Sequence, residues 1–504
     1  MANILLNSMK DSTNFTRTEN GALTHKTTKS DLLDMFAMGA AMRTRSDEDV
    51  ILMFKKAFAE NPLYAMKCLF YIRDVRGGQG ERRFFRVCVK WLAKNYPDVV
   101  RLNLSNFAEY GRWDDLYALE GTQVEADAFR LMKEQLALDV QCKTPSLLAK
   151  WLKSENASSR ESTRLGNKTR EYLGMTHKQY RRTLAVLRSR INIVEKLMSE
   201  NRWDEIEFDK IPSKAGLIYK NAFARRDIIK AKYEKFAKDE TTKVNAGALY
   251  PYEVVEKAID LMGSRAYYSH SRVAMDNVDR LMINKYWENL TDFFAGSKLN
   301  ALCMVDTSGS MHGDPINVAT SLGLYCAEKA GGPFANHYIS FSSRPQLIEC
   351  EGVDFCDKVD RIVRTNLCQN TNIEAAFDMV LNTAIQNHVA QEDMPETIIV
   401  ISDMEFDEAR GYSRWGYNRQ NIPSGETLME GISRKWENSG YEMPHLIYWN
   451  VRAGQANIPS IGNGRISYVS GFSPSIFKTI ASGKSGYDLM MECLTAERYS
   501  AVVA

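Results

Sequence analysis

The sequence predicts a two-part protein of the α + α/β class, in which an N-terminal α-helical solenoid precedes a C-terminal α/β domain. Before about residue 295, apolar residues recur at steps of three and four, and strand-like alternation is scarce. After about residue 297, short β-rich runs alternate with amphipathic helices. The 504 residues are too many for a single core, because a domain commonly holds about 150. We expect an N-terminal arm over 1–45, a helical domain over 46–296 and the α/β domain over 297–504.

The first half carries the apolar stripes of amphipathic helices. In "NPLYAMKCLFYIRDV", Leu63, Met66 and either Leu69 or Phe70 share one face. The glycine-rich "RGGQG" that follows separates this helix from the next. A further stripe is formed by Tyr180, Leu184, Leu187, Ile191, Val194 and Met198. Such helices bury their apolar faces against their neighbours, so we expect stacked helix pairs. No fixed-period sequence repeat accompanies the pattern.

The second half predicts a mostly parallel sheet that is covered by helices on both faces. The expected strands are "ALCMVD", "HYISFS", "QLIEC", "TIIVISD", "HLIYWNV" and "ISYVSGF", and the expected helices lie between and after them. Continuous apolar strands that alternate with helices are typical of this architecture. Ligands of such sheets bind at the carboxyl ends of the strands. "VDTSGS" and "VISDMEFD" place their polar residues at two of these ends.

Small oxygen-bearing side chains gather in "VDTSGSM" (305–311), which supplies Asp306, Ser308 and Ser310. We expect Gly309 to permit the tight turn between the two serines. This Asp-x-Ser-x-Ser pattern resembles the metal-ion-dependent adhesion site of von Willebrand factor A domains, a Rossmann-like fold. The resemblance implies that Thr371, before a mid-domain helix, and Asp403, after a main strand, complete the ligand set.

These ligands suit Mg²⁺ or another divalent cation, because hard oxygens are the ligands that Mg²⁺ prefers. Two carboxylates approximately balance the divalent charge, and neutral hydroxyls complete the shell without repelling an anion. The resemblance implies that the serines ligate directly and that the aspartates often act through water. It also implies one coordination position for a carboxylate or phosphate of a partner.

The stretch "DMEFDE" has a second interpretation, as a two-metal nuclease cluster formed by Asp403, Glu405, Asp407 and Glu408. We favour the simpler interpretation, in which Asp403 ligates and the other three acids cap a solvated loop. His312 lies beside the site without a second His or Cys at ligand spacing, so we expect a surface or capping residue.

The net charge of +2 hides an uneven distribution. Residues 297–504 hold 16 basic and 24 acidic side chains, whereas residues 1–296 hold 49 and 39. The excess is concentrated in 141–190, with 12 basic and 3 acidic side chains, and in 210–240, with 9 and 4. Such asymmetry suggests that the front half contacts an anionic partner.

Several long phrases resemble the Ro family, in which a TROVE module of HEAT-like helices forms a ring that an A domain closes. They are "NPLYAMKCLFYIRDVRGGQGERRFF", "FAEYGRWDDLYAL", "SLLAKWLKSENASSR", "RTLAVLRSRINIVEKLMSENRWDEIEF" and "LYPYEV". The similarity is to a Ro-related group from phages, bacteria, plants and fungi, and it covers nearly the whole chain. One segment, "ENASSRESTRLGNKTREYLG", does not map onto ordinary Ro proteins. The resemblance implies binding of structured small RNA or of its single-stranded ends, as a ribonucleoprotein.

The residues support RNA contact in part, because rows of basic side chains neutralise phosphates and nearby aromatic rings stack on unpaired bases. The candidate RNA-binding residues are Lys168, Arg170, Lys178, Arg181, Arg182, Arg188, Arg225 and Arg226. Tyr172, Tyr180 and Tyr219 are interleaved with them, and Tyr180 is expected in the core because it lies on the apolar stripe.

Three functions remain open from the sequence. The first is a non-catalytic RNA-binding protein, and the second is a protein-binding module whose Mg²⁺ takes a carboxylate from a partner. The third is a metal-dependent nuclease, which is disfavoured because no P-loop lysine and no nucleophile-base pair is present. No apolar stretch approaches the ~20 residues that span a bilayer, and no signal peptide is evident, so we expect a cytoplasmic monomer with no membrane partner.

Overall fold

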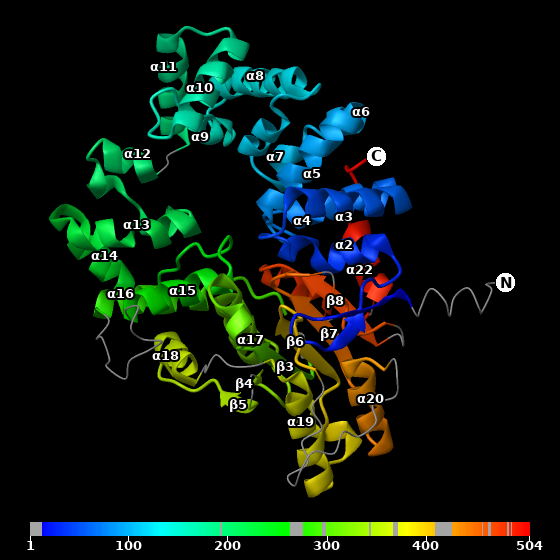
Figure 1. Ribbon diagram of the computed structural model, residues 1–504. Coiled ribbons are helices and arrows are strands. Elements are labelled where there is room, and N and C mark those ends of the chain that lie inside the picture. Colours follow the sequence, from blue (N-terminus) through cyan, green and yellow to red (C-terminus); the bar gives the residue numbers. More distant parts are fainter. Residues whose placement is uncertain are drawn as a thin grey trace. The chain divides into compact units, whose positions relative to one another are not determined.

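Helices dominate the first half of the chain and a six-stranded mixed sheet lies in the second half, as the α + α/β class predicts (Figure 1). The computed structural model describes residues 13–191, 194–262, 276–294, 299–341, 344–365, 371–408, 426–455, 457–461, 465–480, 483–484 and 486–504. The first 12 residues of the expected N-terminal arm therefore lie outside the described residues. The chain divides into two compact units.

The helical unit comprises Pro62–Leu249 and Ala496–Ala504. Its helices are α4 (Pro62–Arg73), α5 (Arg82–Asn95), α6 (Pro97–Leu102), α7 (Asn106–Tyr110), α8 (Glu125–Gln141), α9 (Leu148–Trp151), α10 (Arg160–Leu173), α11 (His177–Arg190), α12 (Val194–Ser199), α13 (Ser213–Arg225) and α14 (Asp227–Lys238), with the 3₁₀ helix η2 (Trp113–Leu119) between α7 and α8. Consecutive helices pack as pairs, α4 against α5 and α13 against α14, and α8 packs against α10 (Figure 1). Whether these pairs form a HEAT-like solenoid stays a prediction.

The apolar stripe predicted around α11 is confirmed over the helix itself, where Tyr180, Leu184 and Leu187 are buried. The helix ends at Arg190 rather than continuing to Met198, and α12 resumes at Val194. The segment that does not map onto ordinary Ro proteins contains α10. Ser159 caps the start of α10, and Gly174, at φ 69°, ends it in the left-handed conformation that glycine adopts without strain.

The last nine residues belong to the helical unit because their side chains and carbonyls are bound there. Arg498 forms an ion pair with the buried Asp74, and Tyr499 donates a hydrogen bond to the same carboxylate (2.9 Å). The Tyr499 ring also packs against Tyr110, with ring centroids 5.4 Å apart. The expected α/β range of 297–504 therefore extends past the sheet unit, which ends at Thr495.

The sheet unit comprises Met1–Asn61 and Tyr250–Thr495. Its strands are β3 (Ala301–Asp306), β4 (His337–Phe341), β5 (Gln346–Glu349), β6 (Thr397–Ser402), β7 (His445–Asn450) and β8 (Ile466–Ser470), in the spatial order β5-β4-β3-β6-β7-β8. The strand pairs are parallel except β4 with β5. All residues of β3 and β6 are buried, which is why these strands read as continuous apolar runs.

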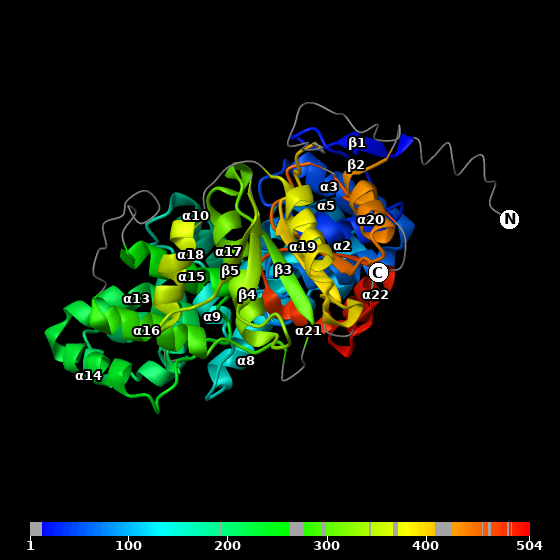
Figure 2. The same ribbon diagram turned by 90° about the horizontal axis from the view of Figure 1, so that it is seen from below.

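Helices cover both faces of this sheet, as predicted. The helix α17 (Asp314–Lys329) packs on β3, β4 and β6 on one side, and α19 (Ile373–Asn387) and α20 (Leu428–Asn438) lie on the other (Figure 2). Gly323 of α17 permits this approach, because a Cβ there would come 2.5 Å from Cγ2 of Val305. The closing segment contains α21 (Phe477–Ile480) and α22 (Gly486–Thr495).

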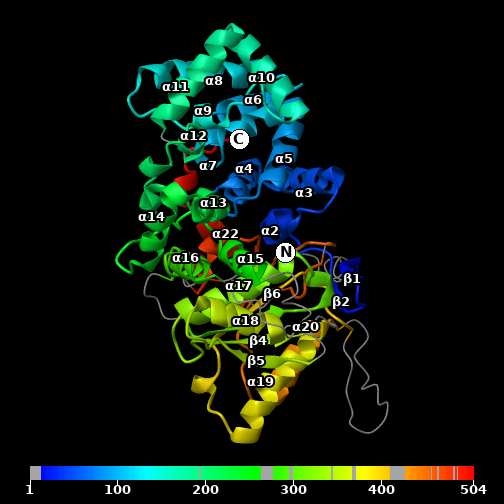
Figure 3. The same ribbon diagram turned by 90° about the vertical axis from the view of Figure 1, so that its left-hand side faces the viewer.

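Segments expected outside the α/β domain also belong to the sheet unit, so its core begins well before residue 297. The helix α2 (Asp31–Met38) packs on β7 and β8, and α3 (Asp47–Glu60) packs on α2. The helices α15 (Pro251–Met262) and α16 (Asn277–Glu288) pack on α17 and on α18 (Phe355–Thr365), respectively (Figure 3). Each carries an apolar face that only a neighbouring helix can cover.

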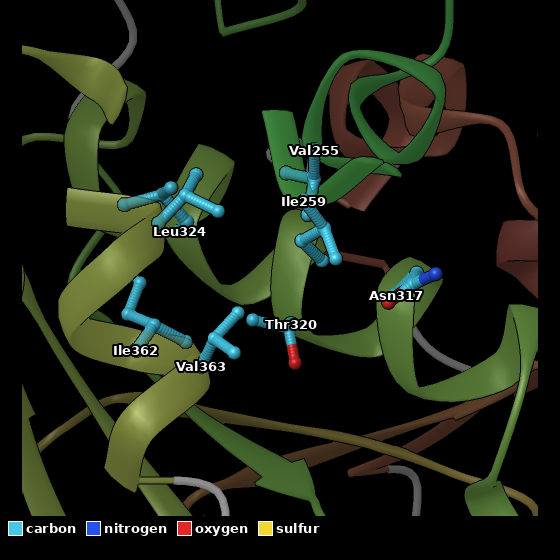
Figure 4. Close-up of a pocket in the computed structure, with 8 residues that line it drawn as sticks. Val255, Ile259, Asn317, Thr320, Leu324, Ile362 and Val363 are labelled. Carbon is cyan, nitrogen blue, oxygen red and sulfur yellow. The ribbon is translucent and has the colours of Figure 1, made fainter. Parts of the chain in front are cut away.

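A small pocket lies where α15, α17 and α18 meet (Figure 4). Val255 and Ile259 of α15 face Leu324 of α17 and Ile362 of α18 across it. Because the pocket is lined mainly by hydrocarbon groups, it belongs to the packing of these helices rather than to a chemical site. Among the described residues, no helix has the length and apolar character needed to cross a membrane.

Candidate functional site

The polar residues predicted at the sheet edge lie at its topological switch point. From β3 the chain continues to β4 on one side, and the later strand β6 pairs with β3 on the other side. In sheets with this strand order the crevice at the carboxyl ends of the two central strands is the usual ligand-binding position. Asp306 is the last residue of β3, and Asp403 directly follows β6.

Asp306 is completely buried and held by hydrogen bonds to both carboxylate oxygens. The backbone N–H of Ser308 donates to Oδ1 (2.9 Å), and the hydroxyl of Ser402 donates to Oδ2 (2.5 Å). The strand register explains the second contact, because Val305 pairs with Ile401 and the next residues along each strand are therefore neighbours. Ser402 also accepts a hydrogen bond from the Met404 N–H (2.9 Å), which fixes the turn after β6.

The two serines of the Asp-x-Ser-x-Ser pattern lie side by side, with their hydroxyl oxygens 3.1 Å apart. The Ser310 hydroxyl also forms a hydrogen bond with the Asp403 carboxylate, so the ends of β3 and β6 share one polar cluster. The Arg452 guanidinium, from the loop after β7, donates to the Ser310 carbonyl and lies near Asp403.

Thr371 joins the same edge through the segment that follows β6. Its carbonyl accepts a hydrogen bond from the Asp407 N–H (3.0 Å), and its side chain is buried. The amide of Asn20 bridges the two segments, because it donates to Thr371 Oγ1 (3.4 Å) and to the Glu405 carbonyl (2.5 Å). The structure thus brings Thr371 to the loop that carries Asp403.

Asn20 belongs to an N-terminal turn that lies along this loop. The turn joins the short antiparallel strands β1 (Phe15–Arg17) and β2 (Leu23–His25). Thr18 donates to the Phe406 carbonyl (2.6 Å), and the Glu19 N–H donates to Glu405 Oε2 (2.7 Å). Residues almost 390 positions apart therefore build the rim of the candidate site.

The site concentrates negative charge in a buried place. Burial and the nearby Asp403 carboxylate raise the pKa of Asp306 to about 7. Burial also raises the pKa of Asp403, against the opposing effect of Ser310 and Arg452. Two buried carboxylates beside two hydroxyls match the donor set of a hard divalent cation, which would favour both ionised carboxylates.

The residues present therefore fit Mg²⁺. Within the described part of the chain no three His, Cys, Asp or Glu side chains gather as a metal site, so hydroxyl ligands would be required. Asp306, Ser308, Ser310, Thr371 and Asp403 would hold the cation, which would supply an electrophilic position for an anionic oxygen.

The expectation for Gly309 is wrong. Gly309 lies in the short 3₁₀ helix η5 (Gly309–Met311) without a positive φ, and a Cβ there would meet nothing within 4 Å. The residue that requires glycine is Gly313, at φ 92° and ψ −141°, which turns the chain into α17. His312 is exposed and caps the end of η5, as expected for a surface or capping residue.

The four acids of "DMEFDE" take different positions. Asp403 and Glu405 are buried, Asp407 is half-buried, and Glu408 is exposed beside Arg17 (3.6 Å). Asp407 and Glu408 contribute backbone N–H groups to Thr371 and Asn20, respectively. This arrangement matches a loop fastened by its backbone better than a set of four convergent carboxylates.

The eight candidate RNA-binding residues all lie in the helical unit but fall into two groups. Lys178, Arg181, Arg182, Arg225 and Arg226 are exposed and form no ion pair with the described residues. By contrast, Lys168 pairs with Glu120 (2.8 Å) and Arg170 pairs with Glu155 (2.9 Å). Arg188 donates to the carbonyls of Ala149 and Leu152 (2.8 and 2.9 Å).

Comparison with known proteins shows the family of this chain. Residues 18–146 and 135–296 match the family described as Domain of unknown function (DUF2828). The chain belongs to this DUF2828 family. Residues 300–497 match a second description, Domain of unknown function (DUF7788).

Two further proteins are similar to this DUF2828 member. An uncharacterized protein of Acanthamoeba polyphaga mimivirus is 29% identical over an alignment that covers 96% of this chain and 88% of that protein. The crystal structure of the Deinococcus radiodurans RO (RSR) protein aligns with 90% of this chain and 93% of that chain, at 13% identity and a TM-score of 0.36.

Sequence reasoning missed three contributors to the site of this DUF2828 member. Ser402 could have been found from the sequence, because it ends β6 directly before Asp403. The pairing of β3 with β6 makes Ser402 the neighbour of Asp306, to which it donates a hydrogen bond. Asn20 and Arg452 carry no local signal, since each reaches the site from a loop that is remote in sequence.

Proposed function

We propose that this chain is a non-catalytic, Ro-like RNA-binding protein of the cytoplasm, monomeric, whose helical unit contacts structured small RNA or its single-stranded ends. The observation that carries the proposal is the group of five exposed basic side chains on α11 and at the end of α13, which form no ion pairs with the described residues. Unpaired basic side chains are available to neutralise phosphates. The phrases that resemble the Ro family add support.

The side chains around these helices are consistent with an RNA surface. Lys230 and Lys238 of α14, the helix that packs against α13, are also exposed. Arg226 lies over the Trp203 ring, 5.0 Å from its centroid. Arginine that is held on an aromatic ring keeps its charge while its plane is oriented for a phosphate or a base.

Filter binding of the full chain to a labelled single-stranded RNA over a salt series tests this proposal. If about six phosphates are neutralised, affinity should fall on the order of 10³-fold between 50 and 200 mM salt. Replacement of Arg181 and Arg182 by Gln should weaken binding and flatten the salt dependence. Weak binding that does not change with salt would remove the proposal.

We further propose that the sheet unit is a von Willebrand factor A domain with a metal-ion-dependent adhesion site. The strand order with one antiparallel edge strand and the convergence of Asp306, Ser308, Ser310 and Asp403 support it. Mg²⁺ would neutralise the two buried carboxylates and leave a coordination position for a partner's carboxylate or phosphate.

Thermal unfolding of the full chain in EDTA and in Mg²⁺ tests the cation site. A cation that binds only the folded state stabilises it by about 2.7 kcal/mol at 100 times its Kd. Asp306→Ala and Asp403→Ala should lose the response to Mg²⁺, whereas Glu408→Gln, in the same loop but exposed, should keep it. An equal response in all four proteins would contradict the site.

A second candidate function is a protein-binding module, in which the cation takes an Asp or Glu from a partner protein. The observation that favours it is that the proposed ligands all lie within the sheet unit, independently of the helical unit. Pull-down with wild type and Asp306→Ala, with and without EDTA, separates the two functions. A partner list that is identical in all conditions would count against the module.

The non-catalytic assignment has its own test. Labelled RNA is incubated with the chain and Mg²⁺ or Mn²⁺, and we expect no cleavage. Cleavage that Asp403→Ala abolishes would instead identify a metal-dependent nuclease.

A further inference from the structure

A half-buried arginine in the helical unit has no carboxylate partner among the described residues. Arg112 lies in the phrase "YGRWDD", directly before the 3₁₀ helix η2, which packs on α5, α7 and α9. Its guanidinium carbon lies 4.5 Å from the centroid of the Trp151 ring of α9. This contact holds the guanidinium plane and leaves its N–H donors without an acceptor within the described chain.

The two aspartates that follow Arg112 cannot balance its charge because other cations already use them. Asp115 is completely buried and pairs with Arg73 (2.7 Å) and with Arg86 (2.7 Å). Asp114 pairs with Arg86 (3.0 Å) and lies 3.8 Å from Lys153. Three cations therefore share two carboxylates before Arg112 is counted.

The local backbone explains why Asp115 does not form an ion pair with the Arg112 guanidinium. Asp115 Oδ2 accepts a hydrogen bond from the backbone N–H of Arg112 (2.9 Å), so the carboxylate binds the main chain of Arg112 and not its guanidinium. Gly111 permits this close turn, because a Cβ there would come 2.3 Å from Asp115 Oδ2 and 3.0 Å from Arg73 Nε.

A second arginine lies on α5, one helical turn before Arg86, which pairs with Asp114 and Asp115 beside Arg112. Arg82, the first residue of α5, is exposed and forms no ion pair with the described residues. Burial is the main effect that lowers the pKa of Arg112. The like charges of Arg73 and Arg82 lower it further, and the Asp114 and Asp115 carboxylates oppose this shift. Arg112 and Arg82 add positive charge at a turn whose two aspartates are already paired with other cations, and such an excess of positive charge favours an anion.

We propose that Arg112 and Arg82 form a phosphate-binding site that grips a phosphodiester of RNA. The assignment rests on the proposed RNA-binding function and adds a position that the basic rows of α11 and α13 do not include. Arginine suits this ligand because its planar fork of N–H donors binds two phosphate oxygens at once. The Lys150 ammonium lies 5.9 Å from the centroid of the same Trp151 ring.

The test uses the full chain and a fluorescently labelled single-stranded RNA of about 20 nucleotides. Arg112→Gln should weaken binding about tenfold, because a charge-assisted hydrogen bond to phosphate is lost. It should also reduce the slope of log K against log salt by ~0.7. Arg82→Gln should act in the same direction, and its exposed position makes it a variant that folds. The control Arg130→Gln removes an equally positive side chain that pairs with Asp127 (2.7 Å) and should change affinity less than about twofold.

The outcomes separate this inference from the proposed function. If Arg82→Gln and Arg112→Gln both bind RNA with the affinity of Arg130→Gln, the phosphate site is overturned. The proposed RNA-binding function would still stand. Absence of RNA binding by wild type would overturn the phosphodiester as its ligand together with the proposed function. Calorimetry with uridine monophosphate and with inorganic phosphate measures whether the site binds a free phosphate group instead of RNA. Binding of either one that Arg112→Gln abolishes, without RNA binding, would support an anion site for free phosphate.

Discussion

The edge of the sheet collects negative charge, whereas the "YGRWDD" turn of the helical unit collects positive charge. In both regions charged groups outnumber the partners of opposite sign beside them. At the sheet edge, Asp306 and Asp403 are buried at the ends of neighbouring strands, and Arg452 is the cation beside them. At the turn, Arg73, Arg86 and Lys153 share two aspartates, which leaves Arg112 and Arg82 without a partner among the described residues. Uncompensated charge is costly where it is buried, so a ligand of the opposite sign would balance each of the two proposed sites.

The two regions also differ in what holds their side chains in place. Strand register brings Asp306 beside Ser402, so the ends of β3 and β6 are placed by the pairing of the sheet. The turn depends on close backbone approach at Gly111 and on carboxylates that bind side chains from α4 and α5. The turn therefore depends on the Asp115 carboxylate, which both Arg73 and Arg86 share.

The largest expected effect is the loss of stability in Asp115→Ala. This change leaves Arg73 buried and both Arg73 and Arg86 without their shared carboxylate, and breaking a buried ion pair costs about 3–5 kcal/mol. Urea denaturation followed by circular dichroism measures the difference. Asp98→Ala is the matched control, because its partner Arg101 and its own carboxylate are solvent-exposed. Equal denaturation midpoints for the two variants would show that the buried network is not what holds the turn.

At the sheet edge, the next largest effect is expected from the glycine that the sequence did not single out. Gly313→Ala should destabilise the sheet unit by about 1–3 kcal/mol, because φ 92° with ψ −141° is a conformation that essentially only glycine adopts. Gly309→Ala should cost nothing, since a Cβ there meets no atom within 4 Å. Thermal unfolding of the two variants side by side decides this, and a larger loss for Gly309→Ala would restore the original expectation.

These contrasts indicate how much could be predicted from the sequence. The strands, the covering helices and the meeting of Asp306 with Asp403 were predictable, because hydrophobic periodicity and strand ends are local signals. The Asn20 bridge to Thr371 was not, since 351 residues separate the two. The boundaries of the two units could not be predicted either. The apolar faces of α2, α15 and α16 are visible in the sequence, but the sequence pattern does not show which element covers each face.

The N-terminal turn offers a smaller test of how firmly the rim of the sheet site is built. Thr18→Val removes a hydroxyl that donates to the Phe406 carbonyl (2.6 Å) and accepts from the Ala22 N–H (3.0 Å). Because both groups lose a buried partner, we expect a loss of about 1–2 kcal/mol. Thr16→Val in the neighbouring strand β1 provides the control. Rapid proteolysis of residues 13–26 in Thr18→Val, but not in Thr16→Val, would confirm that Thr18 fastens the turn, and identical digestion would exclude it.

The smallest effects distinguish basic side chains that are available to RNA from those that are used within the helical unit. Lys168→Gln should leave RNA affinity unchanged, because Lys168 is paired with Glu120, whereas Arg182→Gln should lower it a few-fold.

Hydrogen bonds from Arg164 and then Lys168 lower the pKa of Glu120 from 4.5 to about 2. A depressed carboxyl pKa stabilises the fold above the unfolded value and is lost as the pH falls through the folded value. Any destabilisation by Lys168→Gln should therefore be full near pH 7 and fade below pH 4.5. Weaker RNA binding by Lys168→Gln than by Arg182→Gln would contradict this division of the basic residues.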